Sequence, residues 1–224
     1  MIKHHPNLKL LQSFSAGELP ASLSAAISIH VDMCPVCQAK VTDLTEQFAE
    51  NCFDQDVFDG NDINVDPSPM LALIDSITVD DSIDHVRQDA LGDGGEIVVK
   101  EQTYVLPRAL RSMPLSRFSG IGKLTRARVE LDEGEIHTSL LQIQPGGMIP
   151  EHTHKGFEVT LLLDGEFSDD MGTYEAGDFI MLDGNHQHNP KTEDGCLCLT
   201  VVSDALHFTQ GFGRLLNPFG SLLY

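Results

Sequence analysis

The sequence predicts a multidomain α + all-β protein, in which a small helical bundle is followed by an all-β sandwich or barrel. Three observations predict this fold class. Apolar residues recur at helical spacing over 6–53, the stretch 54–69 is acidic and poor in bulky apolar side chains, and the apolar period falls to about two after residue 100. A chain of 224 residues with 41% hydrophobic content is long enough for one large core or two smaller ones, and two domains are expected.

Three short helices are expected in the N-terminal part. Their apolar positions are Leu8, Leu11 and Phe14 in the first, Leu23, Ile27 and Ile29 in the second, and Val41, Leu44 and Phe48 in the third. Gly17 is expected to follow the first helix, Pro20 to open the second, and Pro35 to lie in the first turn of the third. The connections are short, so neighbouring helices should pack against one another.

The proposed boundaries follow these changes of pattern. Residues 1–80 are expected to form the helical domain, which includes the acidic linker 54–69 and one further helix at about 70–78. That last helix is apolar but too short to be stable alone, so it should dock on another surface. Residues 81–100 are expected to form a second linker that ends in a strand, and residues 101–224 the β domain.

Short runs of β-branched and large apolar residues follow residue 100, separated by glycine and proline turns. The clearest of these runs are TSLLQIQ, EVTLLLDG, GDFIMLDG and CLCLTVVS. Many short strands at close spacing are typical of a sandwich or barrel.

The chain is strongly acidic, with 34 acidic against 14 basic side chains and a net charge of -20. Such a surface repels phosphate backbones and anionic lipid, so direct binding to nucleic acid or to a membrane is not expected. A basic partner fits better, because opposite fields accelerate encounter. No apolar run approaches the roughly 18 residues of a membrane span, and the N-terminus lacks the apolar core of a signal peptide, so we expect a cytoplasmic protein.

Histidine and cysteine gather in the stretch IHVDMCPVCQAK, with the spacing His30-x3-Cys34-x2-Cys37. Residues at i and i+4 of a helix share a face, with Cβ atoms roughly 5 to 6 Å apart, so both can reach one ion. Pro35 disfavours helical geometry at Cys34, so one helix should end there and the next begin at once. The two thiols would then lie at a helix start, whose dipole lowers a thiol pKa and favours the thiolate that zinc requires.

A tetrahedral structural zinc needs four protein ligands. His4 or His5, just before the first helix, would supply the fourth, and the metal would staple a bundle too small to be robust alone. Two alternatives stay open. One is a C-x-x-C redox pair, which usually follows a strand in a βαβ unit, and the other is a pair of buried structural cysteines. The odd total of five cysteines argues against a disulfide scaffold.

An early histidine followed by His-x3-Cys-x2-Cys in a small helical domain resembles the zinc-binding anti-sigma domains. Members of that family bind and sequester alternative sigma factors of the extracytoplasmic-function type. The resemblance maps the zinc ligands onto His5, His30, Cys34 and Cys37. The choice between His4 and His5 is the least constrained of the four.

The stretch GGMIPEHTHKGFEVTLLLDG fits G-x5-H-x-H-x3-E-x6-G, with Gly146, His152, His154, Glu158 and Gly165 in register. Histidines at i and i+2 of a strand point to the same side, and a turn that brings the glutamate to that side would make three ligands converge. Strand histidines that simply face solvent would not explain a glutamate and two glycines at these spacings.

The stretch GDFIMLDGNHQHNP adds Gly177 and, eleven residues later, His188. Together the two stretches resemble the two motifs of the cupin fold, a jelly-roll barrel whose interior holds a metal on three histidines and one glutamate. The site implied by that resemblance is His152, His154, Glu158 and His188. The second motif departs from the family at Asp183 and Thr192, where proline and asparagine are usual. His186 lies two residues too early, so it is expected either behind the metal ligands or at the surface.

A zinc-stapled helical bundle followed by a cupin jelly-roll barrel resembles the ChrR-type anti-sigma factors over nearly the whole chain. The resemblance implies that the helical domain inhibits a sigma factor and that the cupin is needed for its release under oxidative stress such as singlet oxygen. No catalytic residue is then required. The helix at 70–78 would clamp the partner, and the acidic charge suits a basic sigma factor. Three imidazoles and a carboxylate in the cupin suit zinc, iron, manganese or nickel.

Two other functions are compatible with the same residues. A cupin metalloenzyme, such as a dioxygenase, would keep an open metal position for substrate, and a small-ligand sensor would bind without catalysis. No general acid or base is evident beyond the ligands, and an enzyme gives no reason for the N-terminal zinc site. Cys196 and Cys198 share one face of a strand, either as core residues or as an oxidant-sensitive pair near the metal.

Overall fold

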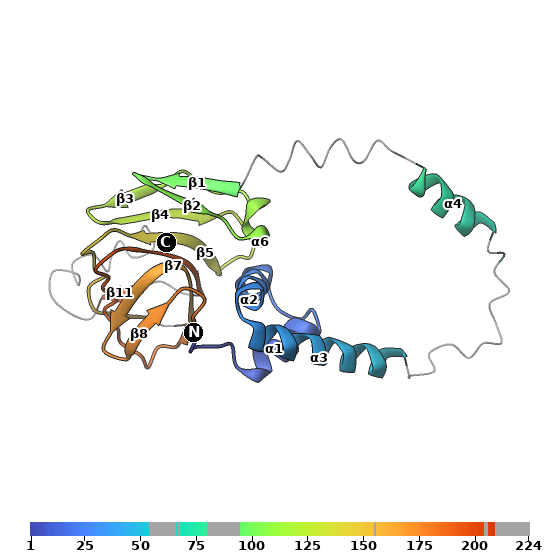
Figure 1. Cartoon of the computed structure of the whole chain (residues 1–224), viewed down its shortest axis with the longest axis horizontal. Helices are drawn as coiled ribbons and strands as arrows, with labels where there is room; N and C mark the ends of the chain where they lie inside the picture. The colour runs from blue at the N-terminus through green and yellow to red at the C-terminus, as the bar shows by residue number, and fades with distance from the viewer. Residues whose placement is uncertain (54–65, 67, 80–94, 155, 204–205, 209–224) are drawn as a thin grey trace.

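The computed structural model describes residues 1–53, 66, 68–79, 95–154, 156–203 and 206–208. Helices α1, α2 and α3 lie to one side of a β domain, and α3 extends away from it, as Figure 1 shows. The predicted order, a helical region followed by an all-β region, is confirmed. Most of the two predicted linkers, 54–69 and 81–100, lies outside the described residues.

The three N-terminal helices are α1 (Leu8–Ser15), α2 (Ala21–Met33) and α3 (Pro35–Phe53). The Asn7 side chain caps α1, because its oxygen accepts a hydrogen bond from the backbone N–H of Leu10 at 2.9 Å. Gly17 follows α1 with a φ of 71°, a left-handed conformation that glycine adopts without steric cost. The three predicted helices are confirmed.

The chain leaves α2 at Cys34, whose backbone is extended, with φ -118° and ψ 102°. Pro35 begins α3 directly afterwards. Proline disfavours the helical conformation in the residue before it and needs no intrahelical acceptor at the first turn of a helix. The predicted junction between the second and third helices is therefore confirmed, and it places Cys34 and Cys37 on the two sides of one tight corner.

The β domain contains twelve further labelled elements, counting one helical turn. They are β1 (Glu96–Val99), β2 (Gln102–Val105), α6 (Arg108–Arg111), β3 (Ser119–Ile121), β4 (Leu124–Val129), β5 (His137–Ile143), β6 (His152–His154), β7 (Glu158–Asp169), β8 (Gly172–Glu175), β9 (Phe179–Leu182), β10 (Cys196–Val202) and β11 (Leu206–Phe208). The main sheet has the order β3-β4-β5-β10-β7-β8, with β9 also on β7. The paired strands are antiparallel, and β5, β7, β9 and β10 are the four apolar runs singled out in the sequence.

Side-chain alternation along the strands divides the sheet into two buried faces. On β10, Cys196 and Cys198 belong to one cluster with Ile143 and Leu162. Residues between them, such as Leu197, belong to a second cluster that continues into the helices. Because successive strand residues point to opposite faces, one face lines the barrel interior and the other supports the helical bundle.

Helix α2 packs on the β domain, where it contacts α6, β7 and β10. Ile27 and Ile29 of α2 share one hydrophobic core with Leu161 and Leu199 of the sheet. Burial of a side chain of this size contributes about 1.5 to 3 kcal/mol. The helices and the barrel therefore share a core, instead of each closing a core of its own.

Helix α4 (Ser68–Thr78) corresponds to the helix predicted at about 70–78 and buries none of its side chains. Its large apolar residues are between 47% and 62% exposed: Met70, Leu71, Leu73, Ile74 and Ile77. Met70, Leu73, Ile74 and Ile77 are spaced i, i+3, i+4 and i+7, so they share one face of the helix. Within the described ranges, no helix combines the length and the apolar character that crossing a bilayer requires.

Candidate metal centres

Four side chains from the helical part meet at the corner between α2 and α3: His5, His30, Cys34 and Cys37. One possible ligand atom from each lies within 4.8 Å of the others. The Nδ1 of His5 is 3.4 Å from the Sγ of Cys34 and 3.5 Å from the Sγ of Cys37. His30, Cys34 and Cys37 are at most 2% exposed. The structure thus brings together the four residues that the sequence singled out.

His4 takes a different position from His5. Its ring lies 4.8 Å from the ring of Tyr174 in the β domain, and its backbone N–H donates to Asp178 at 2.9 Å. His5 follows it and turns toward the two thiols. Of the two histidines that the sequence offered as a fourth ligand, His5 is the one in the cluster.

The protonation of His30 suits a metal ligand. Its Nδ1 donates to the carbonyl oxygen of Gly177 at 2.7 Å, so the proton lies on Nδ1 and the lone pair on Nε2. Nε2 is buried and has no hydrogen-bond partner among the described residues. Burial also lowers the pKa of His30, which favours the neutral ring. A buried unsatisfied acceptor costs about 1 to 3 kcal/mol, and a cation in the cluster would offset this cost.

The thiols differ from the expectation drawn from the helix start. Burial and the neighbouring Cys34 raise the pKa of Cys37 to about 11, so the expected lowering of a thiol pKa by the helix dipole is wrong for this residue. Desolvation of a thiolate outweighs the partial charge of one helix end. A bound divalent cation would lower the pKa of both thiols, because metal-bound thiols are deprotonated. Two sulfur and two nitrogen donors in a closed arrangement fit zinc.

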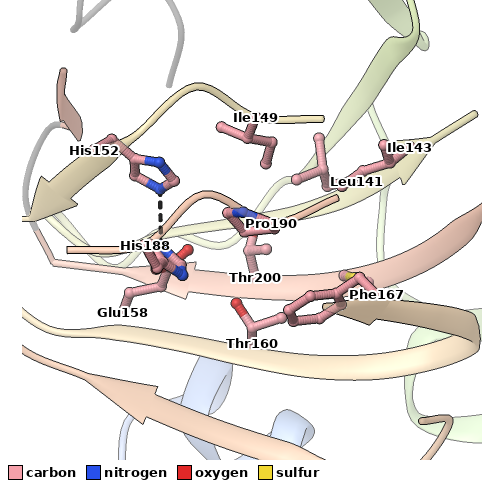
Figure 2. A pocket seen from close by; sticks show the side chains of 11 residues that line it. Leu141, Ile143, Ile149, His152, Glu158, Thr160, Phe167, His188, Pro190 and Thr200 are labelled. Atoms are coloured by element: carbon pink, nitrogen blue, oxygen red, sulfur yellow. Dashed lines mark hydrogen bonds and ion pairs between the residues drawn. The ribbon is translucent and has the colours of Figure 1, made fainter. Parts of the chain in front are cut away.

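A second cluster lies inside the barrel, where His152, Glu158 and His188 come together (Figure 2). The Nε2 of His188 is 2.9 Å from the Nε2 of His152 and 3.1 Å from a carboxylate oxygen of Glu158. His152 Nδ1 donates to the carbonyl oxygen of Pro150 at 2.9 Å, which directs Nε2 into the cluster. Backbone hydrogen bonds of 3.1 Å in both directions hold His152 beside His188.

His154 is the fourth residue that the cupin resemblance assigned to this site. Its backbone belongs to β6, where it pairs with Leu206 of β11. Its side chain lies outside the described residues. His186, in contrast, is 46% exposed and pairs with Asp183 at 2.7 Å, so of its two expected positions it takes the one at the surface.

The barrel cluster forms one wall of a pocket whose other walls are mostly apolar (Figure 2). The apolar lining residues are Leu141, Ile143, Ile149, Phe167, Pro190 and Cys198. Cys196 and Cys198 do share the interior face, and both are at most 2% exposed. A hydrogen bond to Cys196, together with burial, raises the pKa of Cys198 well above its ordinary value, so it is a neutral thiol beside the site.

Asp169, at the end of β7, is a site residue that sequence reasoning missed. Its carboxylate lies 3.6 Å from His188 Nδ1, and its side chain is 1% exposed. It accepts backbone hydrogen bonds from Met171 at 2.8 Å and Gly172 at 3.2 Å. Burial alone would lower the pKa of His188, but Asp169 and Glu158 raise it to about 9. A carboxylate behind a histidine ligand fixes its orientation, and in the sequence this aspartate looks like an ordinary turn residue.

Comparison with known proteins agrees with this architecture. Residues 109–205 match the family described as the ChrR cupin-like domain. Over 97% of its length the chain is 25% identical to the anti-sigma-E factor ChrR of Cereibacter sphaeroides, of which 98% is covered. The predicted resemblance to ChrR-type proteins is therefore confirmed.

The resemblance to ChrR extends to the whole fold. A crystal structure of Rhodobacter sphaeroides SigE in complex with the anti-sigma ChrR matches with a TM-score of 0.65 and 23% identity. The match covers 90% of this chain and 99% of the matched chain. The fold of ChrR, helices followed by a cupin-like domain, is thus the fold of this protein.

Proposed function

We propose that this protein is an anti-sigma factor that binds and sequesters a sigma factor of the extracytoplasmic-function type in the cytoplasm. It is then a negative regulator of transcription that needs no catalytic residue. The observation that carries this proposal is the buried cluster of His5, His30, Cys34 and Cys37 within the helical bundle. The cluster lies in a chain that is similar to an anti-sigma factor over 97% of its length.

Zinc is the metal that we propose for this N-terminal centre. Residues 1–80 form the inhibitory domain in this proposal, and the four side chains hold the segment before α1 onto the corner between α2 and α3. A closed set of two imidazoles and two thiolates leaves no position for a substrate, so the role of the metal is structural. Loss of the metal would then release the segments that present the inhibitory surface.

Helix α4 is the element that we propose as the clamp on the sigma factor. It carries Met70, Leu71, Leu73, Ile74 and Ile77 on its surface, all more than 40% exposed. Docking on a partner would bury this apolar surface and stabilise a helix that is marginal alone. The net charge of -20 favours encounter with a basic sigma factor and occlusion of its DNA-binding surface.

The cupin domain, residues 101–224, is proposed as the part needed for stress-induced release of the sigma factor. Its ligands would be His152, His154, Glu158 and His188, and they would hold zinc or another divalent transition metal such as iron, manganese or nickel. Three of these side chains already converge in the barrel. The neighbouring apolar pocket would hold a small oxidant or ligand beside these side chains. Oxidative stress, including singlet oxygen, is the proposed signal.

Binding of a purified extracytoplasmic-function-type sigma factor to the full chain tests this function. We expect Ile74→Asp on α4 to weaken binding by about 2 kcal/mol, roughly 30-fold, because it places a charge in a buried apolar contact. Ile121→Asp is the matched control, since Ile121 is 77% exposed on β3 and lies on the cupin domain. Equal binding by both variants would exclude α4 as the clamp. No binding by the wild type, together with metal-dependent turnover of a small substrate, would favour the dioxygenase alternative.

A further inference from the structure

The turn between β8 and β9 contacts both histidine-bearing segments of the N-terminal centre. The carbonyl oxygen of Gly177 accepts the hydrogen bond from His30 Nδ1 at 2.7 Å. One carboxylate oxygen of Asp178 accepts from the backbone N–H groups of Lys3 at 2.7 Å and His4 at 2.9 Å. Phe179 then donates its backbone N–H to the carbonyl oxygen of His4 at 3.0 Å. The cupin domain therefore holds the chain immediately before His5.

Hydrogen bonds within the turn also fix the position of Asp178. Asp178 is 0% exposed, and its second carboxylate oxygen accepts the backbone N–H of Glu175 at 2.9 Å. Burial alone would raise the pKa of Asp178, but the backbone hydrogen bonds lower it overall, so the carboxylate stays charged. Gly177 has a φ of 95°, and a Cβ at this position would collide with Ile2. The turn thus has a fixed shape and a close-fitting cover.

We propose that the β8–β9 turn is the outer shell of the N-terminal metal centre, with Gly177 and Asp178 as positioning residues for His30 and His5. This inference rests on the proposed metal site. A histidine can bind a metal through either nitrogen, and the Gly177 carbonyl selects Nε2 by accepting the proton on Nδ1. His5 lies before α1, so no helix positions it. Asp178 supplies that constraint through the two preceding peptide groups.

The consequence is that the N-terminal centre is shared between the two parts of the chain. Its four ligands come from the helical part, but the groups that orient two of them come from the barrel. A movement of the barrel away from α2 would remove the acceptor of His30 and the anchor of His5 together. Metal affinity in the helical part would then fall, and this links the state of the cupin domain to the inhibitory domain.

A matched pair of variants at Lys3, made in the full chain, tests the anchor without touching the turn. Lys3→Pro removes the backbone N–H that donates to Asp178. Lys3→Ala keeps this N–H and loses only the exposed Nζ contact with Glu175 at 3.2 Å. We expect Lys3→Pro to weaken zinc binding at the N-terminal centre roughly 10-fold, measured by competition with a chromophoric chelator. Lys3→Ala should stay within about two-fold of the wild type, because exposed ion pairs contribute little.

A second pair lies in the turn itself. Asp178→Asn should lower zinc affinity about 10- to 100-fold, whereas Glu175→Gln, on an exposed neighbour, should leave it unchanged. Cobalt substituted for zinc reports the ligand geometry, so its visible spectrum should change in Lys3→Pro and Asp178→Asn and not in their controls. If Asp178→Asn does not fold, the comparison of Lys3→Pro with Lys3→Ala still tests whether the turn positions the ligands.

The outcomes separate this inference from the metal site on which it rests. Stoichiometric zinc with unchanged affinity and cobalt spectrum in Lys3→Pro would overturn the outer-shell role and leave the metal site standing. Absence of zinc from the N-terminal cluster of the wild type would overturn both. Weaker binding in Lys3→Pro with helical content equal to that of Lys3→Ala would support positioning by the turn.

Discussion

The two candidate metal centres use histidine in opposite ways. In the N-terminal centre, the ligand nitrogen of His30 has no partner among the described residues, and Cys37 stays a neutral thiol because burial raises its pKa. In the barrel centre, His188 contacts His152 and Glu158 directly, and Asp169 backs its other nitrogen. The barrel centre thus joins its histidines and glutamate by direct polar contacts, whereas in the N-terminal centre His5 Nδ1 contacts the two thiols and His30 Nε2 has no partner among the described residues.

This difference indicates different roles for the two metals. The buried Nε2 of His30 would gain a partner from a bound cation, so metal binding and folding of the helical part should be coupled. In the barrel centre, the contacts among His152, Glu158 and His188 would hold these side chains together after the cation leaves. The same three side chains line a pocket. The first arrangement suits a structural centre and the second an exchangeable, responsive one. The predictions below test this contrast, from the largest expected effect to the smallest.

Replacement of an N-terminal ligand should have the largest effect. We expect Cys37→Ser to release the zinc and to unfold α1–α3, because structural zinc contributes about 10 to 16 kcal/mol of apparent binding free energy to small domains at neutral pH. Far-UV circular dichroism and metal analysis of the full chain measure both changes. Cys52→Ser is the matched control, since Cys52 is exposed on the same helix. Native helicity and full zinc content in Cys37→Ser would show that the cluster is not a structural metal site.

Replacement of a barrel ligand should leave the helical part intact. We expect His152→Ala to lose the barrel metal while it keeps the N-terminal zinc and sigma-factor binding, because the two clusters share no ligand. Release of the sigma factor by oxidant should be blocked in this variant. Metal analysis with a binding assay, before and after oxidant, measures all of these properties. Normal release by oxidant would argue against a role of the barrel metal in the response.

Replacement of Asp169 should have a smaller effect, a weaker metal affinity in the barrel alone. Asp169→Asn removes the charge behind His188, and we expect about 10-fold weaker metal binding in the barrel with unchanged zinc in the helical part. Asp170→Asn is the control, because it makes the same change at an exposed neighbour. Isothermal titration of metal into the metal-free barrel compares the two variants. Equal affinities would show that Asp169 does not position His188.

His186 should have the smallest effect. His186→Ala removes an exposed side chain whose ion pair is with exposed Asp183, so we expect a change in unfolding free energy of about 0.5 kcal/mol or less. The metal content of the barrel should be unchanged. Thermal unfolding and metal analysis are the two measurements. A loss of barrel metal in this variant would make His186 a ligand and reopen the assignment of His188.

Several features of both centres were predictable from local patterns. The spacing of His30, Cys34 and Cys37 places three ligands on one corner, because the helical period and the conformational limits of Pro35 act within a few residues. The alternation of strand residues likewise predicts that Cys196 and Cys198 share one face of their strand. The apolar runs predicted the strands β5, β7, β9 and β10 for the same reason.

Other features depend on contacts between distant segments, and only the tertiary structure decided them. The choice of His5 over His4 depends on Asp178 and Tyr174, which lie far away along the chain. The contact of Asp169 with His188 and the core shared by the helices and the barrel also join segments that are distant in the sequence. The raised pKa of Cys37 depends on burial in that core. Local geometry acts through the backbone of a few residues, whereas burial and long-range hydrogen bonds exist only after the two parts of the chain have docked.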